Sequence, residues 1–150
     1  MSQEMRLSDE APGTRIAFLR FAGPYYHVTT AARWSRIAPE GLRPDAWNRE
    51  RYELVEGNKT PFVCLASKWN REAYVHMVRN DRDGERLVLL EVSADVVAQL
   101  RVELDHTTSE RSFYEARTES TEFEILVWAG VPLVCFDVIP PSALTVVGRY

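Results

Sequence analysis

Two glutamates near the C-terminal end of the chain have surroundings that suggest chemistry. Under the strict side-chain alternation of a strand, Glu122 and Glu124 share one face of the segment 120–128. Two carboxylates on one face, flanked by apolar residues, can shift each other's ionisation, and perturbed ionisation is typical of catalytic sites. A solvent-facing edge strand would give the same pattern, so both interpretations stay open at this point.

A histidine near the other end is the second feature of interest. His27 lies in segment 25–29, whose aromatic and β-branched residues favour a strand. The hydroxyl of Thr30 is predicted to cap a helix over 31–37. Pro39 is predicted to end that helix, and Gly41 to take a positive φ in the turn that follows. A histidine with a purely structural role would fit this pattern equally well.

These two stretches together resemble motifs of the ADP-ribosyltransferase superfamily, which includes poly(ADP-ribose) polymerases, DarT-type DNA-modifying toxins and RNA 2′-phosphotransferases. His27-x-Thr, a helix and then Glu-Gly-Leu at 40–42 resemble the first motif. The run Glu-Ile-Leu-Val at 124–127, with Val-Pro at 131–132, is similar to the strand that carries the catalytic glutamate. The resemblance extends over about residues 15 to 146.

The resemblance implies an enzyme that uses NAD as its substrate. Glu124 would be the catalytic carboxylate, and Glu122 a second carboxylate beside the acceptor. In the family, the histidine of the first motif bonds a ribose hydroxyl, and the next residue contacts the nicotinamide amide through its backbone. Those roles fall on His27 and Val28, and Thr29 would add a hydroxyl. A carboxylate beside the ribose stabilises the positive charge that develops as the nicotinamide bond breaks.

The strand-to-helix unit 62–74 resembles the family's second motif, in which a serine starts the helix. Ser67 is therefore predicted to cap a helix over 68–79 and to lie beside the cofactor. Tyr26 and Arg43 complete the expected cofactor-binding set. Many members of the family carry a tyrosine on the strand of this motif, whereas here the strand has Phe, Val and Cys at 62–64.

Length and composition indicate one domain over 14–150, preceded by a flexible tail over 1–13 in a chain of 150 residues. The element order predicts an α+β fold, with a split, mostly antiparallel sheet and short flanking helices. Segment 86–92 is the strongest predicted strand, and 14–21 is also predicted as a strand. The two cysteines, Cys64 and Cys135, are predicted to be core residues.

Charge and hydropathy limit the classes of partner. The net charge of −4 argues against a broad surface for duplex nucleic acid, although arginines grouped near the first motif allow a local anion pocket. No apolar run reaches the length of a membrane span, and no metal-ligand spacing is present. We therefore expect a cytoplasmic protein with no membrane partner and no metal.

The most favoured hypothesis is a mono-ADP-ribosyltransferase, toxin-like in its motifs, that acts on a nucleic acid or protein acceptor. An antitoxin or immunity protein would be a natural partner of such an enzyme. Three alternatives stay open on the same fold. They are a catalytically silent module that binds ADP-ribose, NAD or a protein, an RNA 2′-phosphotransferase-like enzyme, and an NAD glycohydrolase without a macromolecular acceptor.

Overall fold

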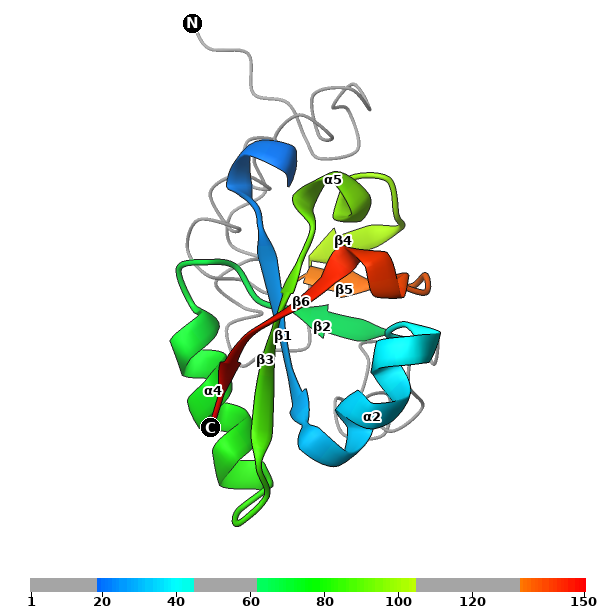
Figure 1. Ribbon diagram of the computed structural model, residues 1–150. Coiled ribbons are helices and arrows are strands. Elements are labelled where there is room, and N and C mark those ends of the chain that lie inside the picture. Colours follow the sequence, from blue (N-terminus) through cyan, green and yellow to red (C-terminus); the bar gives the residue numbers. More distant parts are fainter. Residues whose placement is uncertain (1–18, 45–61, 105–132) are drawn as a thin grey trace, which may run out of the picture.

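A computed structural model describes residues 19–44, 62–104 and 133–150 of the chain (Figure 1). The predicted tail over 1–13 and most of the predicted strand over 14–21 lie outside the described residues. Glu122 and Glu124 also lie outside them. The described part contains the whole first motif and the strand-to-helix unit that follows it.

The first sheet consists of the strands that surround the most hydrophobic segment of the chain. Its antiparallel order is β1-β3-β6, with β1 at Tyr25–Thr30, β3 at Leu87–Val92 and β6 at Leu144–Arg149. The register pairs Tyr25 with Val92 and Thr30 with Leu87. β3 is central because nearly all of its side chains are buried, as its near-continuous apolar sequence predicted.

The second sheet is smaller and is also antiparallel, in the order β2-β5-β4. Its strands are β2 (Val63–Leu65), β5 (Leu133–Cys135) and β4 (Val102–Leu104). In Figure 1 these strands run across those of the first sheet. The chain therefore has an α+β fold with two antiparallel halves, as predicted.

The helix α2 (Ala31–Glu40) directly follows β1, and both of its ends have identifiable causes. The hydroxyl of Thr30 accepts a hydrogen bond from the Arg33 amide at 3.2 Å, which is the predicted N-cap. The prediction that Pro39 ends the helix is wrong, because Pro39 lies inside its last turn. The helix ends at Gly41, which has a φ of 90° and whose amide donates a hydrogen bond to the Ile37 carbonyl oxygen.

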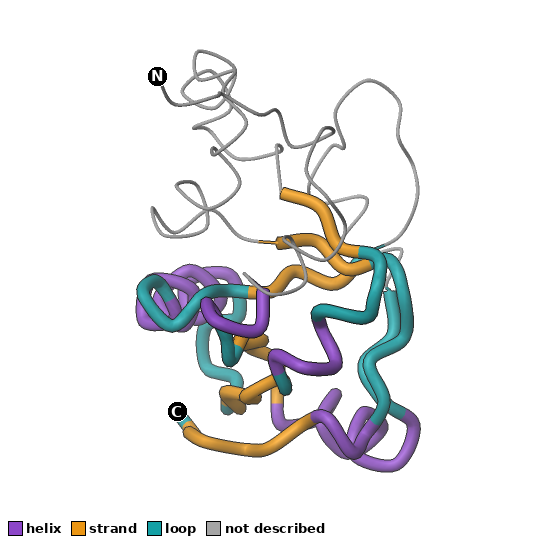
Figure 2. Tube along the Cα trace, turned by 90° about the horizontal axis from the view of Figure 1, so that it is seen from above, coloured by secondary structure: helices purple, strands orange, loops and turns teal. Residues whose placement is uncertain are grey.

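The helix α4 (Arg71–Asp81) covers one face of the first sheet. Val75 is its buried residue, and it packs against the side chains that β1 and β3 present on that face: Tyr26, Val28, Leu87 and Leu89. Figures 1 and 2 show α4 and α2 on opposite sides of this sheet. Two further short helical segments are α5 (Ala94–Val97) and the 3-10 turn η3 (Pro141–Ala143).

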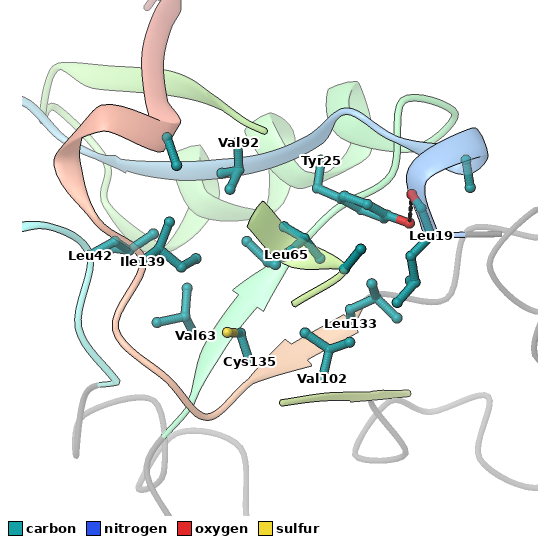
Figure 3. Close-up of a cluster of buried hydrophobic side chains, with 14 residues drawn as sticks. Leu19, Tyr25, Leu42, Val63, Leu65, Val92, Val102, Leu133, Cys135 and Ile139 are labelled. Atoms are coloured by element: carbon teal, nitrogen blue, oxygen red, sulfur yellow. Dashed lines mark hydrogen bonds between the residues drawn. The ribbon is translucent and has the colours of Figure 1, made fainter. Parts of the chain in front are cut away.

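The main core lies between the two sheets (Figure 3). Tyr25 and Val92 face it from the first sheet, and Val63, Leu65 and Cys135 face it from the second. Burying side chains of this size stabilises a fold by about 1.5–3 kcal/mol each relative to exposure, so this cluster is the main driving force that holds the halves together.

The residues before β1 differ from the prediction. Leu19 to Ala22 are helical and not extended. Leu19 and Ala22 are buried while Phe21 is 67% exposed, a spacing that fits a helical turn better than a strand. The Gly23 amide donates to the Leu19 carbonyl at 3.2 Å, and the buried Tyr25 hydroxyl donates to the same oxygen at 3.0 Å. The hydrogen bond from Tyr25 holds Leu19 in the helical turn, and the apolar composition of this segment did not indicate it.

The two cysteines occupy opposite faces of the second sheet. Cys135 pairs with Val63 in the ladder and packs in the main core. Cys64, one residue along, packs on the other face with Phe62 and Val134. Both are buried and neither forms a disulfide, as predicted for core cysteines, and burial raises the pKa of the Cys135 thiol.

We expect Gly41→Ala to destabilise the protein because two costs coincide there. The backbone has a φ of 90°, and a Cβ would lie 2.6 Å from the Ile139 carbonyl oxygen. The expected loss in unfolding free energy is roughly 3 kcal/mol, measured by urea denaturation. Gly84→Ala is the matched control, because its φ is 81° but nothing lies within 4 Å. Equal losses in the two variants would contradict a steric role for Gly41.

Asp137 joins the segment before β4 to the segment after β5. Its Oδ2 accepts from the Arg101 amide at 2.8 Å, and its Oδ1 accepts from the Arg101 Nε at 3.2 Å. The Arg101 amide is the main reason that the pKa of Asp137 lies below its ordinary value of 3.8, and the guanidinium adds to the effect while burial opposes it. The Arg101 side chain is 73% exposed, so solvent screens the pair.

A small acid-dependent loss of stability follows from Asp137. Because its pKa is lower in the folded state, its contribution is present above about pH 4 and is lost as the pH falls through the folded-state value. We expect Asp137→Asn to cost about 1 kcal/mol at neutral pH, and to differ less from the wild type at about pH 3. Urea denaturation at both pH values checks this. A cost that stays the same at both would contradict it.

Candidate functional site

Within the described residues, β1 and β2 meet at one antiparallel backbone pair. The Tyr26 amide donates to the Ala66 carbonyl at 2.8 Å, and the Ala66 amide donates to the Tyr26 carbonyl at 2.7 Å. Away from this pair the strands part, β1 pairing with β3 and β2 pairing with β5. We call the region around this pair the junction. It brings the first motif into contact with the strand-to-helix unit.

His27 connects the two strands where they part. Its Nδ1 lies 2.8 Å from the carbonyl oxygen of Cys64. A carbonyl oxygen only accepts, so Nδ1 carries a hydrogen in this contact. In the neutral ring Nε2 is then the acceptor nitrogen, the atom that suits a hydroxyl donor. The ring is half-buried at the junction, and its orientation is set by the second sheet.

The backbone of Val28 faces the same region. Hydrogen bonds alternate between the two edges of a strand, and the backbone bonds of Tyr26 point outward, to Ala66. Val28, two residues on, therefore also presents its N–H and C=O on that outer edge. Among the described residues, Ala66 is the only strand partner on that edge. An adjacent donor and acceptor of this kind match a carboxamide group.

The side chains of the first motif divide between the two faces of β1. Tyr26 and Val28 are buried under α4. Thr29 lies on the same face as His27, is 5% exposed, and its hydroxyl makes no hydrogen bond within the described part of the chain. His27 and Thr29 thus share one face of β1 and Val28 lies on the other, and their predicted roles at a cofactor stay predictions.

Ser67 is part of a tight turn and does not cap the helix directly. Its amide and its hydroxyl both donate to Asn70 Oδ1 at 2.8 Å, and its Oγ accepts from the Trp69 amide at 3.3 Å. Lys68 to Asn70 form a turn, so α4 begins at Arg71 and not at Lys68. The predicted helix is correct but starts three residues late, because the Asn70 side chain closes the turn.

The remaining predicted residues are not brought to the junction. Arg43 follows Leu42, which forms an isolated bridge with Ile139. The Arg43 side chain is exposed and makes no hydrogen bond or ion pair with the described residues. Glu122 and Glu124, the predicted catalytic carboxylates, lie outside the described residues, so their roles stay predictions.

Arg71 is a junction residue that the sequence motifs did not indicate. Its guanidinium carbon lies 5.0 Å from the centroid of the Tyr26 ring. The contact depends on α4 starting at Arg71 and on Tyr26 facing that helix, and both are tertiary features. A basic residue shortly after the serine of the second motif was the only signal available in the sequence.

Comparisons with known proteins add no assignment. No protein-family model matches the chain, and no curated protein matches it. The described residues include no group of three or more His, Cys, Asp and Glu side chains placed to hold a metal ion. None of the described helices is both long and apolar enough to cross a membrane.

The geometry of His27 predicts its tautomer. With the ring nitrogens labelled, NMR at about pH 8.5, well above the ordinary histidine pKa, should show the hydrogen on Nδ1. The same spectra of His76, an exposed residue of α4, provide an internal comparison from a solvated ring. A hydrogen on Nε2 of neutral His27 would contradict the contact with the Cys64 carbonyl.

Proposed function

We propose that the protein is an NAD-dependent mono-ADP-ribosyltransferase that transfers ADP-ribose to a nucleic acid or protein acceptor. The observation that carries this proposal is the arrangement of His27. Its Nδ1 is hydrogen-bonded to the Cys64 carbonyl, so Nε2 of the neutral ring is the acceptor nitrogen, and Val28, the next residue, presents its backbone on the strand edge that faces away from β3. The proposed roles of Glu124, Thr29 and NAD itself follow from the resemblance described above.

The two groups at the junction complement the nicotinamide half of NAD. A ribose hydroxyl is a donor that Nε2 of His27 can accept, and the nicotinamide carboxamide has one donor and one acceptor group. The N–H and C=O of Val28 present the reciprocal pair on the strand edge where Ala66 is the only partner within the described residues. Together these contacts would fix both the ribose and the base, and so orient the bond between them.

The proposed chemistry uses Glu124 as the catalytic carboxylate. The bond from ribose C1′ to the nicotinamide nitrogen breaks, and nicotinamide leaves with the electron pair. Positive charge then develops on the ribose ring, and the Glu124 carboxylate stabilises it. The acceptor forms a bond to C1′ and loses its proton to Glu124 or to solvent. Glu122 would position the acceptor.

A silent binding module is the second candidate, because the same junction supports it. His27 and Val28 hold a ligand in this proposal but perform no bond breaking. A protein with these contacts and no active carboxylate would bind ADP-ribose or NAD without turnover. One assay, with binding and turnover measured side by side, separates the two candidates.

We expect purified protein to release nicotinamide from NAD, and Glu124→Gln to lower that rate by at least about 100-fold. His27→Asn should also lower the rate strongly. The Asn side chain can still donate to the Cys64 carbonyl, but it lacks the acceptor that Nε2 supplies. Nicotinamide release is followed by chromatography, and thermal unfolding confirms that each variant is folded.

Glu85→Gln is the control for the glutamate variant, since Glu85 is an exposed residue paired only with Arg82 in the described part. It should leave the rate unchanged. Full activity in Glu124→Gln would remove Glu124 from the mechanism. ADP-ribose binding without nicotinamide release by the wild type would favour the silent module, and the absence of both would refute both candidates.

A further inference from the structure

The Arg71 guanidinium is held over an aromatic ring at the junction. Its carbon lies 5.0 Å from the centroid of Tyr26, which is itself 4% exposed. Contact with a ring face occupies one side of the guanidinium plane and leaves its N–H groups pointing outward in that plane. The Arg71 side chain is 41% exposed, so those groups are accessible.

The other contacts of Arg71 are weak. Glu72 Oε1 lies 3.9 Å from Nε, a long separation for an ion pair, and the Glu72 side chain is 66% exposed. Within the described residues the two Nη nitrogens make no hydrogen bond. The planar pair of nitrogens that binds an oxyanion in bidentate fashion is therefore available in the folded protein.

The first-turn amides of α4 and the Tyr26 hydroxyl are two further polar groups at this position. Asn70 stands at the N-cap of α4 but makes no capping bond from its side chain, because its Oδ1 accepts from Ser67. The amides of the first turn are thus uncapped by that side chain, and they carry partial positive charge. The Tyr26 hydroxyl belongs to a buried side chain and makes no hydrogen bond among the described residues.

The turn before α4 supplies a second basic side chain. Lys68 is exposed, and its Nζ lies 4.7 Å from the centroid of the Trp69 ring. Lys68 in the turn and Arg71, the first residue of α4, each lie over an aromatic ring, on a protein whose net charge is negative. Local positive charge of this kind attracts anions even where the net charge is −4.

We propose that the start of α4, with Arg71 over Tyr26 and Lys68 in the turn before it, is a phosphate-binding site. The side chains of Tyr26 and His27 lie on opposite faces of β1, so a ligand bound here would reach the junction around the edge of that strand. The source of the phosphate rests on the proposed function: it is either the pyrophosphate of the dinucleotide or the backbone of a single-stranded nucleic acid acceptor.

The test compares Arg71→Gln with Arg79→Gln, a matched control on the same helix whose guanidinium lies 5.9 Å from the Tyr150 ring. One arm measures ADP-ribose binding by calorimetry, and the other measures binding of a labelled single-stranded oligonucleotide by fluorescence anisotropy. We expect Arg71→Gln to weaken one of these by about tenfold to about 100-fold, and Arg79→Gln to change neither. Arg71→Lys should recover only part of the loss, because it lacks the planar fork.

Loss in the ADP-ribose arm assigns the site to the dinucleotide, and loss in the oligonucleotide arm assigns it to the acceptor. Wild-type affinity of Arg71→Gln in both arms would overturn the proposal, as would equal losses in the two glutamine variants or no binding of either probe by the wild type. Binding through Arg71 without nicotinamide release would support the phosphate site and contradict the transferase function. Failure of the phosphate site and failure of the proposed function are therefore distinguishable.

Discussion

The backbone pair between Tyr26 and Ala66 is the constraint on which the candidate site depends. It is where β1, a strand of the first sheet, meets the end of β2, a strand of the second. Because the strands part beyond it, the outer edge of β1 at Val28 is not covered by β2, and His27 can reach across to the Cys64 carbonyl.

The helix α4 packs on both halves of the fold beside that junction. Tyr74 packs against the apolar cluster under the first sheet and also against the cluster of Phe62, Cys64 and Val134 on the second. The turn from Ser67 to Asn70 sets where this helix begins and therefore where Arg71 lies. The same packing that stabilises the two sheets thus places a cation beside the first motif.

Much of the local structure was predictable because it depends on nearby residues. The Thr30 cap, the positive φ of Gly41 and the central position of β3 follow from side-chain chemistry and apolar content within a few residues. The helical turn over 19–22 and the late start of α4 were not predicted. Each depends on a side-chain hydrogen bond or a buried contact. The pattern of apolar residues does not show which residue is the partner in that contact.

Composition and residue patterns alone were enough to predict the α+β class, the strand that carries His27 and the burial of both cysteines. Three arrangements could not be predicted: His27 meets the Cys64 carbonyl, Val28 presents its backbone on the edge of β1 that faces away from β3, and Arg71 lies on Tyr26. The reason is the distance along the sequence between the residues that come into contact. Propensity and periodicity act between residues close in sequence, whereas these three arrangements depend on residues brought together by the packing of two sheets and a helix.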